Sequence, residues 1–104
     1  MRITIKKSGK KISLNVREMK GINKMLGLMC YRDNLLFNFN SIKQPIHSFF
    51  CPSFLACWLD KNNQVLEMRK IKPWQINLKP KQEFSKLIEI PLSNYKIVKF
   101  LVGN

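Results

Sequence analysis

Short stretches near the start of this chain alternate hydrophobic and polar residues with the period of two that is typical of strands. Residues 2–6 place Ile3 and Ile5 on one side, and residues 11–16 repeat the pattern, so we expect two short strands here. The segment 7–10 between them contains a glycine and has the length of a hairpin turn. The pattern therefore predicts that the two strands pair antiparallel.

The middle of the chain, from Pro45 to Trp74, is too densely hydrophobic for a strand on the surface. Part of it should be covered on both faces and form the core. Polar residues at 60–63 predict a turn, and Pro73, which has no backbone N–H to donate, predicts the end of the strand that follows. The strands expected in the rest of the chain cover residues 35–40, 46–50, 54–59, 64–72 and 86–90.

Elsewhere the pattern favours a helix or little regular structure. Apolar residues at spacings of three and four predict a short helix over residues 18–27, ending at Gly27. Residues 93–102 fit either a short helix or a last strand, and the spacing does not separate the two. The polar segment 75–84 should be the least ordered part of the chain.

These elements predict a mainly β fold, or at most an α+β fold. We expect a small, closed or nearly closed β-barrel or sandwich of about seven short, mostly antiparallel strands with one short helix near residues 18–27. The chain of 104 residues is long enough for one hydrophobic core and shows no repeat or linker, so residues 1–104 should form a single domain.

The charge is strongly unbalanced. The chain has 19 Lys and Arg against 6 Asp and Glu, a formal net charge of +13, which would attract phosphates or acidic proteins. The cations are 15 Lys and only 4 Arg, however, and Arg is the residue better suited to reading phosphate geometry. Two interpretations therefore stay open: a concentrated functional patch, or a composition bias that scatters lysines evenly over the surface.

Several landmarks occur in an order that resembles one known family. They are Gly27-Leu28-Met29, Leu36-Phe37-Asn38-Phe39, His47-Ser48-Phe49-Phe50, Trp58-Leu59-Asp60, Val65, Lys72-Pro73-Trp74 and Leu87-Ile88-Glu89-Ile90-Pro91. The chain resembles, over about residues 12–92, the archaeal form of the domain of unknown function 192 (DUF192) family. The resemblance implies a compact, mostly antiparallel β fold and no catalytic or cofactor residues. The chain departs from the family in a short segment between Met29 and Phe37, and in having Cys51 and Cys57 where apolar residues are expected.

No constellation for catalysis or metal binding emerges from the sequence. His47 and Cys51 would share one face of a regular strand but lie too far apart for one metal ion, and Cys57 is the nearest further thiol. No third group is placed to orient His47 against a cysteine, and no phosphate-binding loop is present. We therefore expect no catalytic residues, no metal, no cofactor and no enzymatic activity.

The remaining features concern the compartment. Cys30, Cys51 and Cys57 are an odd number without close pairing, which argues against a disulfide framework and for a reducing compartment. Residues 1–11 lack the apolar run of a signal peptide, and the longest apolar-rich stretch, 46–59, is broken by Pro52 and too short to span a bilayer. We expect a cytoplasmic protein without a membrane partner.

The candidate binding site is a group of basic residues beside an exposed Pro-Trp. Its members are Arg69, Lys70, Lys72, Trp74, Lys79 and Lys81. Their charges would contact a phosphate backbone and Trp74 could stack on an unpaired base, or Trp74 could instead cover the open end of the barrel. The leading hypothesis is thus a non-catalytic domain that binds nucleic acid, RNA above all, or an acidic protein.

Two alternatives belong to other functional classes. The first is a structural or protein-interaction module whose charge reflects composition bias, which predicts evenly spread lysines. The second is a small-ligand pocket at a barrel mouth, lined by Phe49, Trp58 and Trp74.

Overall fold

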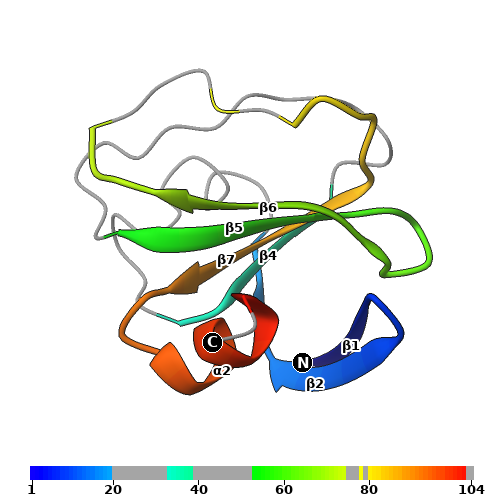
Figure 1. The fold of residues 1–104 in the computed structure, drawn as a ribbon, viewed down its shortest axis with the longest axis horizontal. Coiled ribbons are helices and arrows are strands. Elements are labelled where there is room, and N and C mark those ends of the chain that lie inside the picture. The colour runs from blue at the N-terminus through cyan, green and yellow to red at the C-terminus, as the bar shows by residue number, and fades with distance from the viewer. Residues whose placement is uncertain (20–32, 39–52, 75–77, 79, 103–104) are drawn as a thin grey trace.

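Two β-sheets and a helix make up the described part of the protein (Figure 1). The computed structural model describes residues 1–19, 33–38, 53–74, 78 and 80–102. The strands are β1 (Arg2–Lys7), β2 (Lys10–Asn15), β3 (Arg17–Glu18), β4 (Leu35–Asn38), β5 (Phe54–Leu59), β6 (Val65–Ile71) and β7 (Lys86–Pro91), and the helix is α2 (Tyr95–Val102). The mainly β class predicted from the sequence is confirmed.

Strands β1 and β2 form the antiparallel hairpin that the alternating pattern predicts. Ile3 and Ile5 of β1 lie on the same side as Leu14 of β2, and all three are buried. The φ angles of Ser8 and Gly9 in the turn are 50° and 79°. Positive φ at both central residues is the pattern of the type I′ turn, whose twist matches that of the two strands.

The larger sheet has the strand order β3-β4-β7-β5-β6. Strand β3 runs parallel to β4, and the other neighbouring strands pair antiparallel. Among the described strands β3 and β6 are the two edges, so this sheet is open and the predicted closed barrel is not formed by them. One face of this sheet is covered by the β1–β2 hairpin and α2, so its apolar side chains are buried without closure of the sheet into a barrel.

Strand β5 is buried along its whole length, as expected for a run without polar residues. Its side chains alternate between two hydrophobic clusters, one on each face of the sheet. One cluster contains Phe54, Ala56 and Trp58, and the other contains Leu55, Cys57 and Leu59. The prediction that the middle of the chain is covered on both faces is confirmed at this strand.

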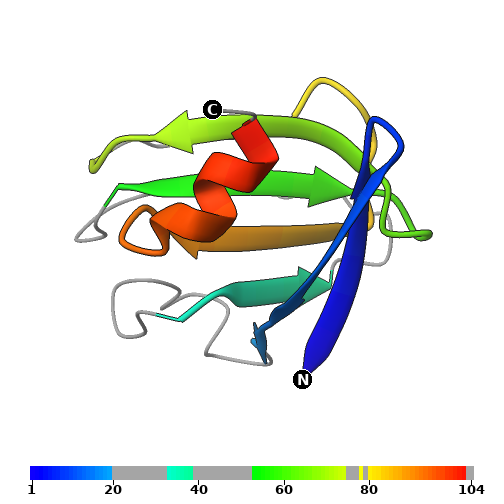
Figure 2. The same cartoon turned by 60° about the horizontal axis from the view of Figure 1, so that its bottom comes forward.

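The β1–β2 hairpin and α2 cover the same face of the larger sheet (Figure 2). Ile3, Ile5 and Leu14 of the hairpin pack in one cluster with Val98 and Leu101 of the helix and with the Leu55 side of β5. The first and last described elements of the chain therefore share one layer.

Residues 93–102, which the sequence left undecided, contain the helix α2. The carbonyl of Asn94 accepts a hydrogen bond from the backbone N–H of Val98 at 3.2 Å. Val98 and Leu101, three residues apart, are buried, while Lys96 and Lys99 are exposed, as on an amphipathic helix. No helix among the described residues is long and apolar enough to cross a membrane.

Other predictions have mixed outcomes. Strands β4, β6 and β7 lie close to the predicted ranges. The predicted strand 46–50 lies outside the described residues, as does most of the predicted helix 18–27, whose first residue, Glu18, belongs to β3. The segment 75–84 was expected to be poorly ordered, but Leu78 and Phe84 are core residues. Isolated apolar residues have no periodicity, which is why the pattern missed them.

The hairpin turn gives a test of backbone strain. Gly9→Val should lower the free energy of unfolding by about 1–2 kcal/mol, since a side chain is strained at positive φ. Open space surrounds the position that a Cβ would take, so no clash adds to this cost. Urea denaturation would measure it, with Gly9→Asn as the matched control because Asn tolerates this conformation. Equal losses in the two variants would contradict a conformational origin.

Candidate functional site

The structure separates residues that the sequence grouped as a binding site. Arg69 and Lys70 are adjacent on β6 and therefore face opposite sides of the sheet. Arg69 forms an ion pair with Glu67, and its guanidinium lies 5.3 Å from the ring centroid of Trp58. Lys70 is exposed on the side that carries α2.

The other members of the predicted set follow β6. Lys72 and Lys81 are exposed, and the backbone N–H of Lys81 donates a hydrogen bond to Glu67 Oε1 at 3.2 Å. Lys79 lies outside the described residues. Because Glu67 lies among these cations and offsets part of their charge, the described members do not form one acid-free patch.

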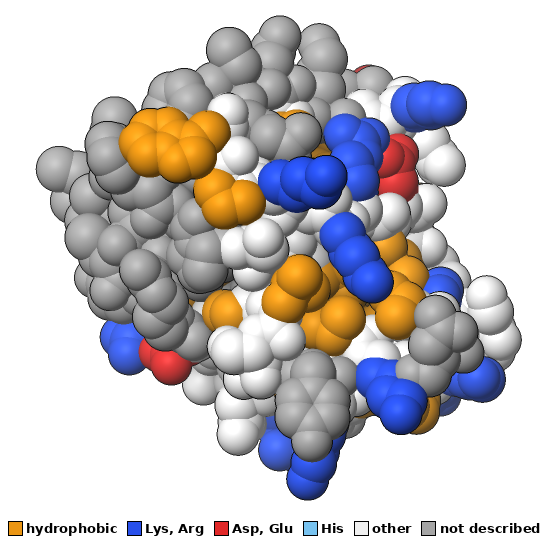
Figure 3. Space-filling model, turned by 60° about the vertical axis from the view of Figure 1, so that its left-hand side comes forward, with side chains coloured by type: hydrophobic (Ala, Val, Ile, Leu, Met, Phe, Trp, Pro, Cys, Tyr) orange, Lys and Arg blue, Asp and Glu red, His pale blue; other side chains and the backbone are white. Residues whose placement is uncertain are grey.

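Trp74 lies just beyond the end of β6, in an exposed position. Its φ angle is 65°, a left-handed conformation, and the residue is 61 % exposed. The alternative in which Trp74 closes the end of a barrel is therefore wrong. Figure 3 views the end of the sheet where β5 begins and β6 and β7 end, and shows Lys and Arg side chains around exposed hydrophobic ones.

The two described aromatic residues of the predicted ligand pocket, Trp58 and Trp74, differ fully in exposure. Trp58 is 0 % exposed and offers no surface to a ligand, while Trp74 is exposed and Phe49 lies outside the described residues. The buried Nε1 of Trp58 has no hydrogen-bond partner among the described residues. Trp58 is thus a core residue whose ring packs against Arg69.

The described cysteine is unsuited to chemistry as a thiolate. Burial raises the pKa of the Cys57 thiol to about 12, although nearby Lys7 acts in the opposite direction. The thiol is therefore protonated at neutral pH, and the thiolate is the form that attacks or binds metal. Cys30, Cys51 and His47 lie outside the described residues. Within the part of the chain that is described, no three His, Cys, Asp or Glu side chains are placed to hold a metal ion.

Two acid-free stretches of the sequence meet on one face of the fold. No Asp or Glu precedes Glu18, and none follows Glu89. The β1–β2 hairpin and α2, which come from these stretches, lie side by side over the sheet (Figure 2). We call this surface the helix–hairpin face; its cationic residues are Arg2, Lys6, Lys7, Lys10, Lys11, Lys96 and Lys99.

Several carboxylates of the chain have partners among the described residues. Asp33 pairs with Arg17 at 3.0 Å, and Glu67 pairs with Arg69. Asp60 accepts hydrogen bonds from backbone N–H groups of its own turn. The sequence marked the hairpin as the densest run of positive charge, but it did not reveal that α2 extends the same face.

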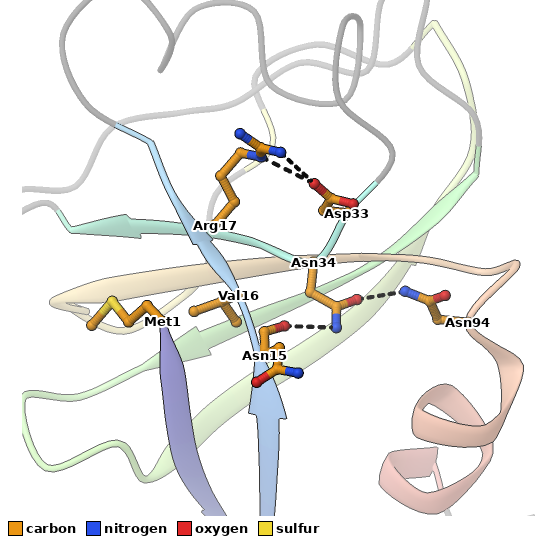
Figure 4. A pocket seen from close by; sticks show the side chains of 7 residues that line it. All are labelled: Met1, Asn15, Val16, Arg17, Asp33, Asn34 and Asn94. Carbon is orange, nitrogen blue, oxygen red and sulfur yellow. Dashed lines mark hydrogen bonds and ion pairs between the residues drawn. The ribbon is translucent and has the colours of Figure 1, made fainter.

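A polar pocket of about 520 Å³ lies where the end of β2 and the residues before β4 and α2 meet (Figure 4). It is lined by Met1, Asn15, Val16, Arg17, Asp33, Asn34 and Asn94. The buried amide of Asn34 donates to the carbonyl of Asn15 at 3.1 Å and accepts from Nδ2 of Asn94 at 2.7 Å. These amides satisfy one another, so their arrangement serves to join three segments of the chain.

Glu89 of β7 is a buried acid that the sequence reading did not single out. Its residue is 4 % exposed and lies in register with Ala56 and Leu35, on the face that contains Trp58. Burial raises the pKa of its carboxyl from 4.5 to about 8. The carboxyl is therefore mostly protonated at neutral pH, which lowers the cost of keeping it out of water.

No family model and no curated protein matches this sequence. Two solved structures are similar to it in fold. A protein of unknown function from Novosphingobium aromaticivorans has a TM-score of 0.72 at 10 % sequence identity, over 92 % of this chain and 77 % of that chain. A protein from Sinorhizobium meliloti, described as "a putative transcription regulator", has a TM-score of 0.70 at 16 % identity, over 93 % and 83 %. At these identities the likeness shows the fold alone.

The buried carboxyl predicts a pH-dependent stability. The unfolded chain loses the Glu89 proton near pH 4.5 and the folded chain near pH 8, so folded protein binds more protons between these values. The free energy of unfolding should therefore fall as the pH rises from about 4.5 to about 8, by up to about 1.4 kcal/mol per pH unit. Glu89→Gln should remove this part of the decline in urea titrations and be the more stable protein at pH 8.

Glu83→Gln is the matched control, because Glu83 is exposed. It should keep the decline of the wild-type protein. An unchanged decline in Glu89→Gln would show that the Glu89 carboxyl is not its source.

The hydrogen bonds of Asn34 predict how much stability is lost when this residue is replaced. Asn34→Ala should lower the free energy of unfolding by about 1–3 kcal/mol, because it leaves the carbonyl of Asn15 and the Asn94 amide without this partner in a part-buried site. Asn62→Ala, at an exposed turn position, should change it by less than about 0.5 kcal/mol. Thermal melts of both variants make the comparison, and similar melting temperatures would count against the network.

Proposed function

We propose that this protein is a non-catalytic β domain that binds an acidic partner, RNA in the first place, through the helix–hairpin face. The observation that carries the proposal is the meeting of the two acid-free stretches on one side of the sheet. A surface of one charge sign attracts a polyanion from several ångströms away and releases the counterions of its phosphates.

The dimensions of the protein suit a nucleic acid. Its principal extents are 33 × 28 × 26 Å, and B-form DNA advances about 3.4 Å per base pair, so one face can follow roughly eight to ten steps of a helix. Six of the seven cations on the helix–hairpin face are lysines. A Lys ammonium acts as a point charge without a fixed fork of donors, which favours contact with the phosphate backbone over reading of base edges. The proposed binding is therefore largely independent of sequence.

The predicted set around β6 has a secondary place in this proposal. Lys70 lies on the helix side of the sheet and can extend the face. Arg69 is paired with Glu67 and packed on Trp58, so it is held by the protein itself. The competing interpretation, a protein-interaction module with evenly scattered lysines, fits less well with two neighbouring elements that carry seven cations and no carboxylate of their own.

Two further proposals concern origin and compartment. We propose that the chain belongs with the DUF192 family, on the order of landmark residues given above. The Sinorhizobium protein is described as "a putative transcription regulator", and at 16 % identity this description only indicates what to test. The buried free thiol of Cys57 is compatible with a cytoplasmic location.

Filter binding with single- and double-stranded RNA and DNA tests the proposal. The wild-type protein should retain nucleic acid at near-physiological salt, and its affinity should fall steeply as salt increases. The double variant Lys10→Gln/Lys11→Gln should lower the slope of log affinity against log salt by about 1.4 for a single strand and the affinity about tenfold.

The matched control removes the same charge from the predicted set, as Lys72→Gln/Lys81→Gln, and should have the smaller effect. No retention of any nucleic acid by the wild-type protein would remove the proposal. Equal losses in the two double variants would remove the assignment to the helix–hairpin face.

A further inference from the structure

A small recess lies at the tip of the helix–hairpin face, between the hairpin turn and the last turn of α2. Its volume is about 200 Å³, and it is lined by Lys7, Ser8, Lys10, Ile12, Phe100 and Leu101. Two amines, a hydroxyl and an aromatic ring thus meet around one opening. The recess is smaller than the roughly 300–1,000 Å³ of pockets that enclose a whole drug-sized ligand, so it suits a single ring.

The register of the hairpin explains how the recess is built. Lys7 and Lys10 are the last pair of the ladder before the turn. Strand alternation places them on the same side as Ile5 and Ile12, toward the body of the protein. Nζ of Lys7 donates a hydrogen bond to the carbonyl oxygen of Leu101, which fixes the hairpin tip against the end of the helix.

The floor and rim of the recess have different chemistry. Phe100 is 46 % exposed, an unusual position for a large apolar ring, and it is one of three large hydrophobic residues exposed in the described chain. The side chain of Lys10 is exposed and makes no hydrogen bond or ion pair with any described residue. Lys99 precedes Phe100 on α2 and is also exposed. The exposed ring of Phe100 thus lies near exposed lysine side chains.

We propose that this recess receives an unpaired base of a single-stranded nucleic acid, stacked on Phe100, with the flanking phosphates on Lys10 and Lys99. The inference rests on the proposed function and adds to it the kind of strand that is preferred. Proteins that bind single strands combine a basic groove with aromatic rings on which bases stack, and this recess has both parts.

Two other polyanions fit the recess less well. The bases of a duplex are already stacked and paired, so their faces cannot reach Phe100. A membrane surface would need apolar side chains that project together. The other large hydrophobic residues exposed among those described are Met1, at the far end of the hairpin from the turn, and Trp74, beyond the end of β6. They do not combine with Phe100 into one apolar surface.

Fluorescence anisotropy tests the proposal with a labelled 12-nucleotide single strand, a duplex of equal length and an abasic single strand with the same phosphates. The wild-type protein should prefer the single strand with bases. Phe100→Ala should weaken that binding about 5- to 150-fold, the range measured for one stacked base, and leave duplex and abasic binding unchanged. Phe100→Trp should restore it, and Trp74→Ala, the control at the other exposed aromatic residue, should not change it.

The outcomes separate this inference from the function on which it rests. If no nucleic acid binds, both fail. If all three probes bind alike and Phe100→Ala changes none of them, the base site is overturned while the polyanion function stands. If phosphatidylserine-containing vesicles bind and the single strand does not, with Phe100→Ala weakening only the vesicles, the face is a membrane surface and this inference is wrong.

Discussion

The fold depends on the need to keep both faces of the β5–β7 pair away from water. The two strands lie side by side in the larger sheet, and side chains of both supply each of the two apolar clusters. A sheet that is apolar on both sides requires a cover on each. On one side that cover is the β1–β2 hairpin together with α2. The first and last described elements therefore lie next to each other, because both are needed to bury the same face of the central strands.

That cover also explains where the charge lies. The inward residues of the hairpin and helix are fixed by packing, as Ile5 and Leu101 illustrate, whereas their outward residues are mostly exposed to solvent. Lysines can therefore gather there without a structural cost, whereas the carboxylates remain where they hold a turn or an ion pair. Lys7 lies at the boundary between the inward and the outward residues of the hairpin. Its amine donates a hydrogen bond to the carbonyl of Leu101 at the end of the helix.

The sequence predicted those features that depend on local alternation or on density of apolar residues. The hairpin, its turn and the buried β5 are of this kind. It was less informative where geometry depends on distant residues: the described strands form an open sheet, whose helix-side face is covered by separate elements, and do not close into a barrel. The basic set around β6 was grouped by adjacency, yet Arg69 and Lys70 point to opposite sides of a strand. Asn34 gave no signal at all, because an isolated polar residue acquires its role only from partners 19 and 60 positions away.

The bond between Lys7 and Leu101 joins residues 94 positions apart, and this separation sets an order on biosynthesis. A hairpin can close in about 1–10 μs, but ribosomes add roughly 5–20 residues per second, so several seconds pass before the helix exists to meet it. Strand β7 lies between β4 and β5 in the sheet and comes just before α2 in the chain. The centre of the sheet and the helix that covers it therefore become available almost together, long after the hairpin.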